Sequence, residues 1–132
     1  MKKDIQTKAD IIKMVDQFYE LVKKDSLLGP IFTDVSKVDW VSHLPKMYDF
    51  WENVIFFTGT YSGNPLKTHQ KIHGLSPLTK NHFQRWYALF IKTVDSLFKG
   101  EKATLAKTRA NQISLVIQDK LARVDKLQNL FN

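Results

Sequence analysis

The chain has 132 residues, which suffice for one domain with its own hydrophobic core and leave too little for a second. It contains no cysteine, so disulfide bonds, thiolate metal ligands and a cysteine nucleophile are excluded. Its net charge of +7 comes from lysines spread along the whole sequence rather than from an arginine-rich run. We therefore expect a single domain over residues 1–132, in which residues 1–6 form a flexible N-terminal extension.

The first predicted helix covers residues 7–24, where apolar residues recur at helical spacing. Thr7 is a suitable N-cap, and Asp10 three residues later completes a sequence typical of a capping box. Gly29 and Pro30 end this region, and Ile31-Phe32 begins a short hydrophobic turn. The inward side of this helix includes Tyr19 beside Phe18.

The second predicted helix runs from His43 to Phe57, with Ser42 as its N-cap. Pro45 sets this start, because proline is tolerated only in the first turn of a helix. Residues 59–65 are rich in the glycine, serine, asparagine and proline of turns, and a short helical piece follows from Leu66 to His73.

Two further helices complete the predicted secondary structure. Thr79 caps one that continues through Phe98, and Gly100 separates it from a last helix over residues 102–127. No segment alternates apolar and polar residues with the period of a strand. The sequence therefore predicts an all-α protein.

The motifs of several enzyme classes are missing. There is no glycine-rich phosphate loop and no nucleophile elbow. His69 and His73 have the i, i+4 spacing of a zinc helix, but Gln70 stands where a zinc protease needs its glutamate. Two histidines without a third ligand make a weak zinc site.

Four residues with polar groups lie on otherwise apolar faces or between two chain breaks. They are His43, Tyr19, Trp86 and His69. Any one of them alone is more often a core residue that finds a local hydrogen-bond partner. Together they suggest an apolar pocket for a flat ligand, with an imidazole on one side and hydrogen-bonding groups on the other.

The sequence resembles the truncated haemoglobins, most closely their group III, over nearly the whole chain from Ile11 to Ile117. Five pieces in this order carry the resemblance: Phe18-Tyr19, Leu28-Gly29-Pro30-Ile31-Phe32, His43-Leu44-Pro45-Lys46-Met47-Tyr48-Asp49-Phe50-Trp51, Tyr61-x-Gly63-x-Pro65-Leu66-x-x-His69, and His82-Phe83-x-Arg85-Trp86. The Gly-Gly pairs of the other groups are absent. The resemblance implies a truncated globin, a two-over-two helical sandwich around haem b.

The resemblance also implies roles for individual residues. His69 matches the proximal iron ligand, and Tyr19, His43 and Trp86 match the distal residues that face a bound ligand. The residues expected to contact the haem are Phe32, Lys46, Met47, Phe50, Leu66, Ile72 and Phe83. Lys46, Lys67, Lys71 and Arg85 remain equal candidates for the propionates. The stretch between His69 and Trp86 is longer than the family pattern, so His73 stays an alternative proximal ligand.

The resemblance implies a haem protein that reversibly binds dioxygen and other diatomic ligands, NO and CO, with an unidentified reductase as partner. Whether it is an enzyme stays open; a nitric-oxide dioxygenase or peroxidase-like haem enzyme is the first alternative. The second is a basic helical module for nucleic acid or membrane, without a cofactor. We expect no specific nucleic-acid or membrane partner, a monomer or weak dimer, and a cytoplasmic location, because no targeting or long apolar segment is present.

Overall fold

The structure is a computed structural model that describes residues 1–59, 61 and 63–131, with side chains described up to residue 127. Its elements in chain order are α1 (Lys8–Lys24), η1 (Ile31–Val35), α2 (Trp40–Phe56), α3 (Pro65–Leu75), α4 (Lys80–Leu97) and α5 (Glu101–Phe131). No strand occurs within these ranges. The prediction of an all-α protein is confirmed.

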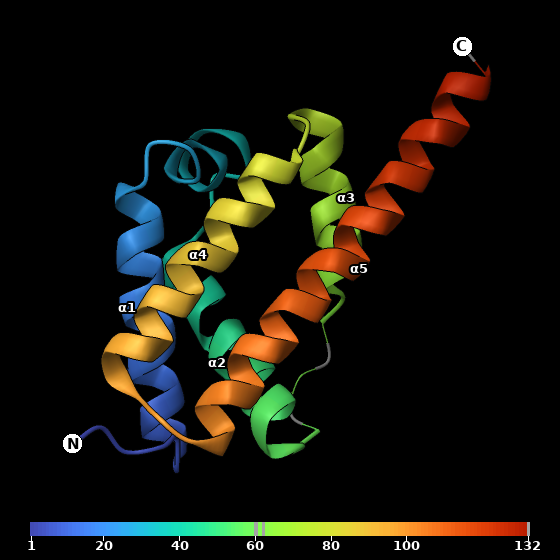
Figure 1. Ribbon diagram of the computed structural model, residues 1–132. Helices are drawn as coiled ribbons and strands as arrows, with labels where there is room; N and C mark the ends of the chain where they lie inside the picture. Colours follow the sequence, from blue (N-terminus) through green and yellow to red (C-terminus); the bar gives the residue numbers. More distant parts are fainter. Residues whose placement is uncertain (60, 62, 132) are drawn as a thin grey trace.

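Four of the helices form two layers. α1 packs against α2 in one layer and α4 packs against α5 in the other, while α1 also contacts α4 and α2 contacts α5 (Figure 1). This is the expected two-over-two sandwich. α3 lies outside the two layers and packs mainly against α5, whose C-terminal turns project beyond the rest of the fold (Figure 1).

The core lies between the layers and is rich in aromatic rings. Phe18, Trp51 and Phe90 are each at most 2% exposed, and the Trp51 and Phe90 rings stack at 4.6 Å. In the first turns of α5 the buried positions hold small side chains, including Ala103 and Ala106, so the helix backbone can approach this core closely. Each large buried side chain stabilises the fold by about 1.5–3 kcal/mol.

α1 begins as the sequence predicts. The Thr7 hydroxyl accepts a bond from the Asp10 N–H, and the Asp10 carboxylate accepts one from the Thr7 N–H. This reciprocal pair satisfies N–H groups that have no partner inside the helix. The chain then leaves α1 and forms η1, a single π-helical turn at the site of the expected hydrophobic turn.

α2 begins three residues earlier than predicted. Its N-cap is Asp39, whose carboxylate accepts from the Val41 N–H at 3.2 Å, so Ser42 is not the cap. Pro45 therefore lies beyond the first turn and cannot donate to the Val41 carbonyl. Val41 is 86% exposed, so the missing bond lies at the surface of the protein, where its cost is lower than in the core.

The other helix bounds differ from the predictions by a few residues. α3 is longer than the expected Leu66–His73 because Asn64 caps it and Pro65 occupies the first helical position. α4 begins after Thr79 as expected, with the Thr79 N–H donating to His82 Nδ1. α5 extends beyond residue 127, where we expected it to end.

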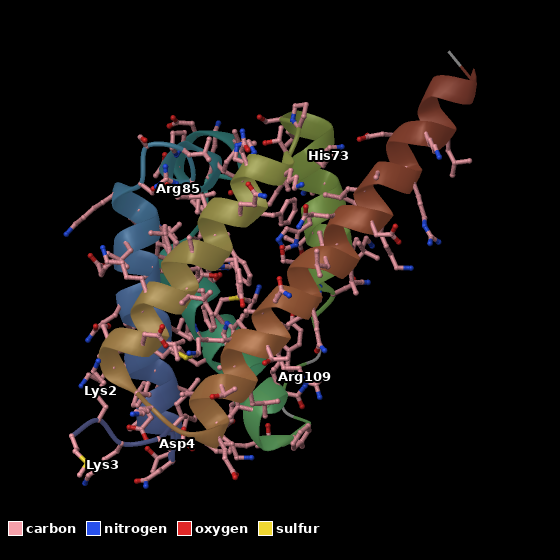
Figure 2. All side chains as sticks on the ribbon, in the orientation of Figure 1. Lys2, Lys3, Asp4, His73, Arg85 and Arg109 are labelled. Atoms are coloured by element: carbon pink, nitrogen blue, oxygen red, sulfur yellow. The ribbon has the colours of Figure 1, made fainter. Side chains whose placement is uncertain are left out.

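The N-terminal segment is not a free extension, contrary to the prediction for residues 1–6. Ile5 is only 2% exposed, and the Asp4 carboxylate accepts from the N–H groups of Lys102 and Ala103 at 2.9 Å each. Gly100 makes room for Asp4, because a Cβ at position 100 would lie 2.5 Å from Asp4 Cγ. Its φ of +147° is also one that residues with a side chain rarely adopt. Asp4 therefore caps α5 from the far end of the sequence and holds the segment on the fold (Figure 2).

Candidate functional site

Four rings from three elements meet at one end of α2. Tyr19 of α1, Phe32 of η1 and Trp40 and His43 of α2 lie within ring-contact distance of one another. The Tyr19 and His43 centroids are 5.4 Å apart, and the Phe32 and Trp40 rings stack at 5.6 Å. The fold thus brings two of the three predicted distal residues together, with Phe32 beside them.

His43 carries an unpaired polar atom in this cluster. Its Nε2 is buried and, among the described residues, is the single buried side-chain nitrogen or oxygen without a hydrogen-bond partner. Burial lowers the pKa of His43, and the nearby positive charge of Lys46 lowers it further, so the imidazole is neutral at pH 7. A buried polar group without a partner costs about 1–3 kcal/mol. A polar ligand within hydrogen-bond distance of Nε2 would remove that cost.

Tyr19 remains a hydroxyl donor. Burial raises the pKa of its phenol well above the usual value, and the neighbouring Tyr61 raises it further. The Tyr19 O–H therefore keeps its proton at any physiological pH. It can donate a hydrogen bond to a negatively charged atom in the site.

Trp86, the third predicted distal residue, lies outside the cluster of four rings. It contacts Phe18 edge-on at 5.8 Å and stacks on Phe90 at 5.8 Å. In the described part of the chain, no ring contact joins Trp86 to Tyr19 or His43. Phe18 links the two groups, since it also touches Tyr19 at 5.0 Å.

His69 is held by its own helix. Its Nδ1 lies 2.6 Å from the Pro65 carbonyl oxygen one turn earlier in α3 and donates to it, so the proton is on Nδ1 and Nε2 keeps its lone pair. Burial lowers the pKa of His69, and the bond to Pro65 acts in the opposite direction. A neutral imidazole whose far nitrogen donates to a backbone carbonyl is the usual arrangement of a metal-binding histidine. The donor therefore fits a haem iron.

His73 is engaged at both ring nitrogens. Its Nδ1 accepts from the Leu78 N–H at 2.9 Å, and its Nε2 donates to the Asp125 carboxylate at 2.8 Å. His73 therefore has no ring nitrogen left for a metal, whereas His69 uses only Nδ1 in a bond to the protein.

The predicted wall residues fall into two groups. Met47 and Phe50 on α2, and Leu66 and Ile72 on α3, are half-buried, which leaves apolar surface on both helices for a flat apolar ligand. Phe83 is instead buried in a second, smaller cluster. Its ring lies 6.3 Å from that of His69, so it backs the imidazole.

Of the four basic residues expected near the haem propionates, one forms an ion pair in another part of the fold. The Arg85 guanidinium lies 3.6 Å from the Asp25 carboxylate, next to the end of α1 and away from α3 (Figure 2). Lys46 lies close enough to His43 to affect its pKa, and Lys67 and Lys71 are exposed on α3. These three lysines remain the candidates.

Two residues of the site were not among the predicted site residues. Trp40 lay outside the predicted helix, but it is three residues before His43 and therefore lies on the same face of α2. Asp39 as the predicted N-cap would have included Trp40 in the helix. Tyr61 packs edge-on against Phe50 at 5.1 Å. Gly63 makes room for it, because a Cβ there would lie 2.2 Å from the Tyr61 oxygen.

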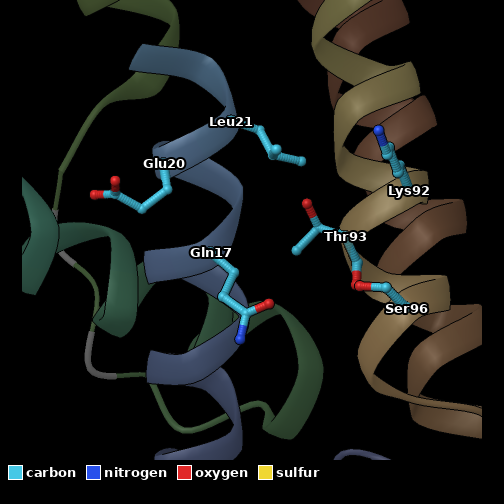
Figure 3. A pocket seen from close by; sticks show the side chains of 6 residues that line it. All are labelled: Gln17, Glu20, Leu21, Lys92, Thr93 and Ser96. Carbon is cyan, nitrogen blue, oxygen red and sulfur yellow. The ribbon is translucent and has the colours of Figure 1, made fainter. Parts of the chain in front are cut away.

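An open groove of about 300 Å³ between α1 and α4, where Gln17 and Leu21 face Thr93, contains none of the predicted residues (Figure 3). The ranges described contain no cluster of three or more potential metal-ligating side chains. They also contain no helix with the length and apolar character needed to cross a bilayer.

Comparisons with known proteins point to one family. A family model described as bacterial-like globin matches residues 3–119. A group 3 truncated hemoglobin of Campylobacter jejuni is 32% identical over 124 residues, which cover 92% of this chain and 95% of that protein. The crystal structure of a group III truncated hemoglobin from Campylobacter jejuni superposes with a TM-score of 0.79, at the same identity and coverage.

Proposed function

Because the chain belongs to the bacterial-like globins, and among them to the group III truncated haemoglobins, we propose that it binds haem b and, through it, dioxygen and other diatomic ligands. His69 would hold the iron in this proposal. The half-buried apolar residues of α2 and α3 would contact the porphyrin, with Lys46, Lys67 or Lys71 at the propionates.

The observation that carries the proposal is the hydrogen bonding of His69. Its Nδ1 is fixed to the Pro65 carbonyl, so Nε2 keeps a lone pair and the ring has one orientation on α3. His73, the alternative, spends both nitrogens on protein partners. A neutral, oriented imidazole beside half-buried apolar side chains is the arrangement that haem ligation needs.

Haem, when bound, supplies an iron with an open position for a diatomic ligand. The chain's own contribution is the pair of polar groups from Tyr19 and His43. Dioxygen carries more negative charge when bound than carbon monoxide does, so O–H and N–H donors favour dioxygen. Each hydrogen bond to a charged atom contributes about 1.5–3 kcal/mol.

The test is substitution of the proposed ligand. His69→Gly should abolish the five-coordinate ferrous absorption spectrum of the haem-loaded protein, and added imidazole should restore it. His73→Gly tests the alternative ligand one turn further along α3, and it should keep a five-coordinate spectrum because His69 still supplies the ligand. If His73→Gly loses it and His69→Gly does not, the assignment of the ligand is wrong.

The hydrogen-bond donors of Tyr19 and His43 also bear on what the protein would do with bound dioxygen. Donors that hold dioxygen firmly suit chemistry on the bound molecule, such as oxidation of nitric oxide with a reductase to restore the ferrous state, more than release for transport. Consumption of nitric oxide by the oxygenated protein, supplied with a chemical reductant, tests this. If the protein consumes nitric oxide no faster than free haem does, the proposed oxidation of nitric oxide is wrong and the proposal reduces to ligand binding.

A further inference from the structure

α3 has less apolar support than the other helices. Among its described residues none is buried, and it packs mainly against α5. Burial of apolar surface, which holds α1, α2 and α4 together, therefore contributes little to the position of α3. Polar contacts at its two ends carry correspondingly more weight, and the one at the N-terminal end is the Asn64 cap.

At the C-terminal end, His73 connects three segments. It belongs to α3, accepts from the N–H of Leu78 in the loop before α4, and donates to Asp125 of α5. The His73 side chain is 13% exposed and that of Asp125 is 49% exposed, so the bond lies at the surface with its imidazole side buried. Figure 2 shows His73 at this end of α3. The bond joins residues 52 positions apart in the sequence.

The same region backs His69. Leu78 packs against the cluster formed by Phe83, Ile117 and Leu121, and the ring of Phe83 lies beside that of His69. His69 and His73 are four residues apart in one helix, so they lie on neighbouring positions of one face. A shift of this end of α3 would therefore move the His69 ring relative to Phe83.

We propose that His73 and Asp125 are a positioning pair, which fixes α3 to α5 and thereby sets the place of the His69 imidazole before any cofactor binds. His73 acts through the helix and does not bind iron. The bond of His69 Nδ1 to Pro65 transmits the position of the helix backbone to the ring. The part of this inference that concerns His69 rests on the proposed function, whereas the fixing of α3 does not.

The first test uses the cofactor-free protein. Asp125→Ala should speed amide hydrogen exchange at residues 68–72 at least fivefold, with little change in α1. Asp119→Ala is the matched control, because Asp119 lies on the same helix in an exposed pair with Arg123. Asp125→Glu, which keeps the carboxylate, should restore much of the protection. Exchange within twofold of wild type in Asp125→Ala would overturn the proposal.

The second test uses the haem-loaded protein and a signal that a merely structural role would not move. The iron–histidine stretching band in the resonance Raman spectrum should shift or broaden in Asp125→Ala and stay unchanged in Asp119→Ala. An unchanged band in Asp125→Ala would overturn the positioning role. If His69→Gly itself keeps the band, the proposed function fails, and the exchange experiment still decides whether the pair fixes α3.

Discussion

At the scale of single residues, the environment decides what each polar group can do. Tyr19 and His43 are ordinary residue types, but burial keeps the phenol protonated and the imidazole neutral. His43 Nε2 also lacks a protein partner. These properties follow from packing against Phe32 and Trp40, which no local pattern in the sequence reveals.

Tyr19→Phe should accelerate dioxygen dissociation from the haem-loaded protein at least tenfold, equivalent to about 1.4 kcal/mol. The carbon monoxide off-rate should change much less, because that ligand carries little charge to stabilise. Trp86→Phe should act in the same direction but less strongly, since Trp86 packs on Phe18 and Phe90. Flash photolysis and stopped-flow mixing measure both rates.

Tyr87→Phe on α4 is the control for Tyr19→Phe and Trp86→Phe, because it removes a hydroxyl from a residue that lies outside the candidate site. It should leave both off-rates near those of wild type. If the dioxygen off-rate of Tyr19→Phe also stays within twofold, the polar distal site is contradicted even where haem binding holds.

His43→Leu should stabilise the cofactor-free protein by about 1 kcal/mol, because it removes a buried nitrogen that has no partner. Urea denaturation at pH 7 measures this change. The same variant should alter dioxygen binding when haem is present. A destabilised His43→Leu chain would show that Nε2 has a partner in solution.

At the scale of elements, capping residues set where helices begin. Asp39 starts α2 at Trp40, which brings Trp40 onto the face of His43 and into contact with Phe32. Pro45 suggested a later start from sequence, but an exposed Val41 tolerates the missing hydrogen bond. The start of this helix therefore changes the composition of the site.

Asp4→Ala should destabilise the protein by about 1 kcal/mol at pH 7, through loss of the cap on α5. Burial alone would raise the pKa of Asp4, but the N–H groups of Lys102, Ala103 and Ile5 together hold it below 3.8. A lowered folded pKa means that this stabilisation is present above 3.8 and is lost as the pH falls through the folded value.

Denaturant unfolding of wild type and Asp4→Ala between pH 7 and pH 2 tests this. The difference between them should hold at neutral pH and shrink in the acid range. Asp119→Ala, which removes an exposed carboxylate on the same helix, should show a smaller effect. A difference that persists unchanged at the lowest pH would contradict a role for the ionised Asp4 carboxylate.

At the scale of the whole molecule, the positive charge is distributed. Several cations lie in ion pairs on different elements, among them Lys8 with Asp49 and Lys107 with Asp95. The lysines proposed for the propionates lie on α2 and α3, apart from these pairs. Such a surface favours solubility and general electrostatic attraction rather than recognition of a particular sequence.

Binding of duplex DNA and of anionic vesicles should therefore be weak at physiological salt. Non-specific electrostatic binding gives Kd values of about 10⁻⁴–10⁻⁶ M and falls steeply with salt. Fluorescence anisotropy with two unrelated duplexes at several salt concentrations measures it. A submicromolar, sequence-selective complex at that salt would support the basic interaction module instead.

The helices and their order could be predicted from the sequence, because helical periodicity and capping residues act within a few positions. The sequence also carried the family resemblance and the candidates His69, Tyr19, His43 and Trp86. Which of these candidates lie in contact could not be predicted in this way, because it depends on the packing of the helices. Tyr19 and His43 come together with Trp40, Trp86 lies one ring away, and His73 is committed to Asp125. These contacts join residues far apart in the chain, so they depend on how the two helix layers and α3 pack.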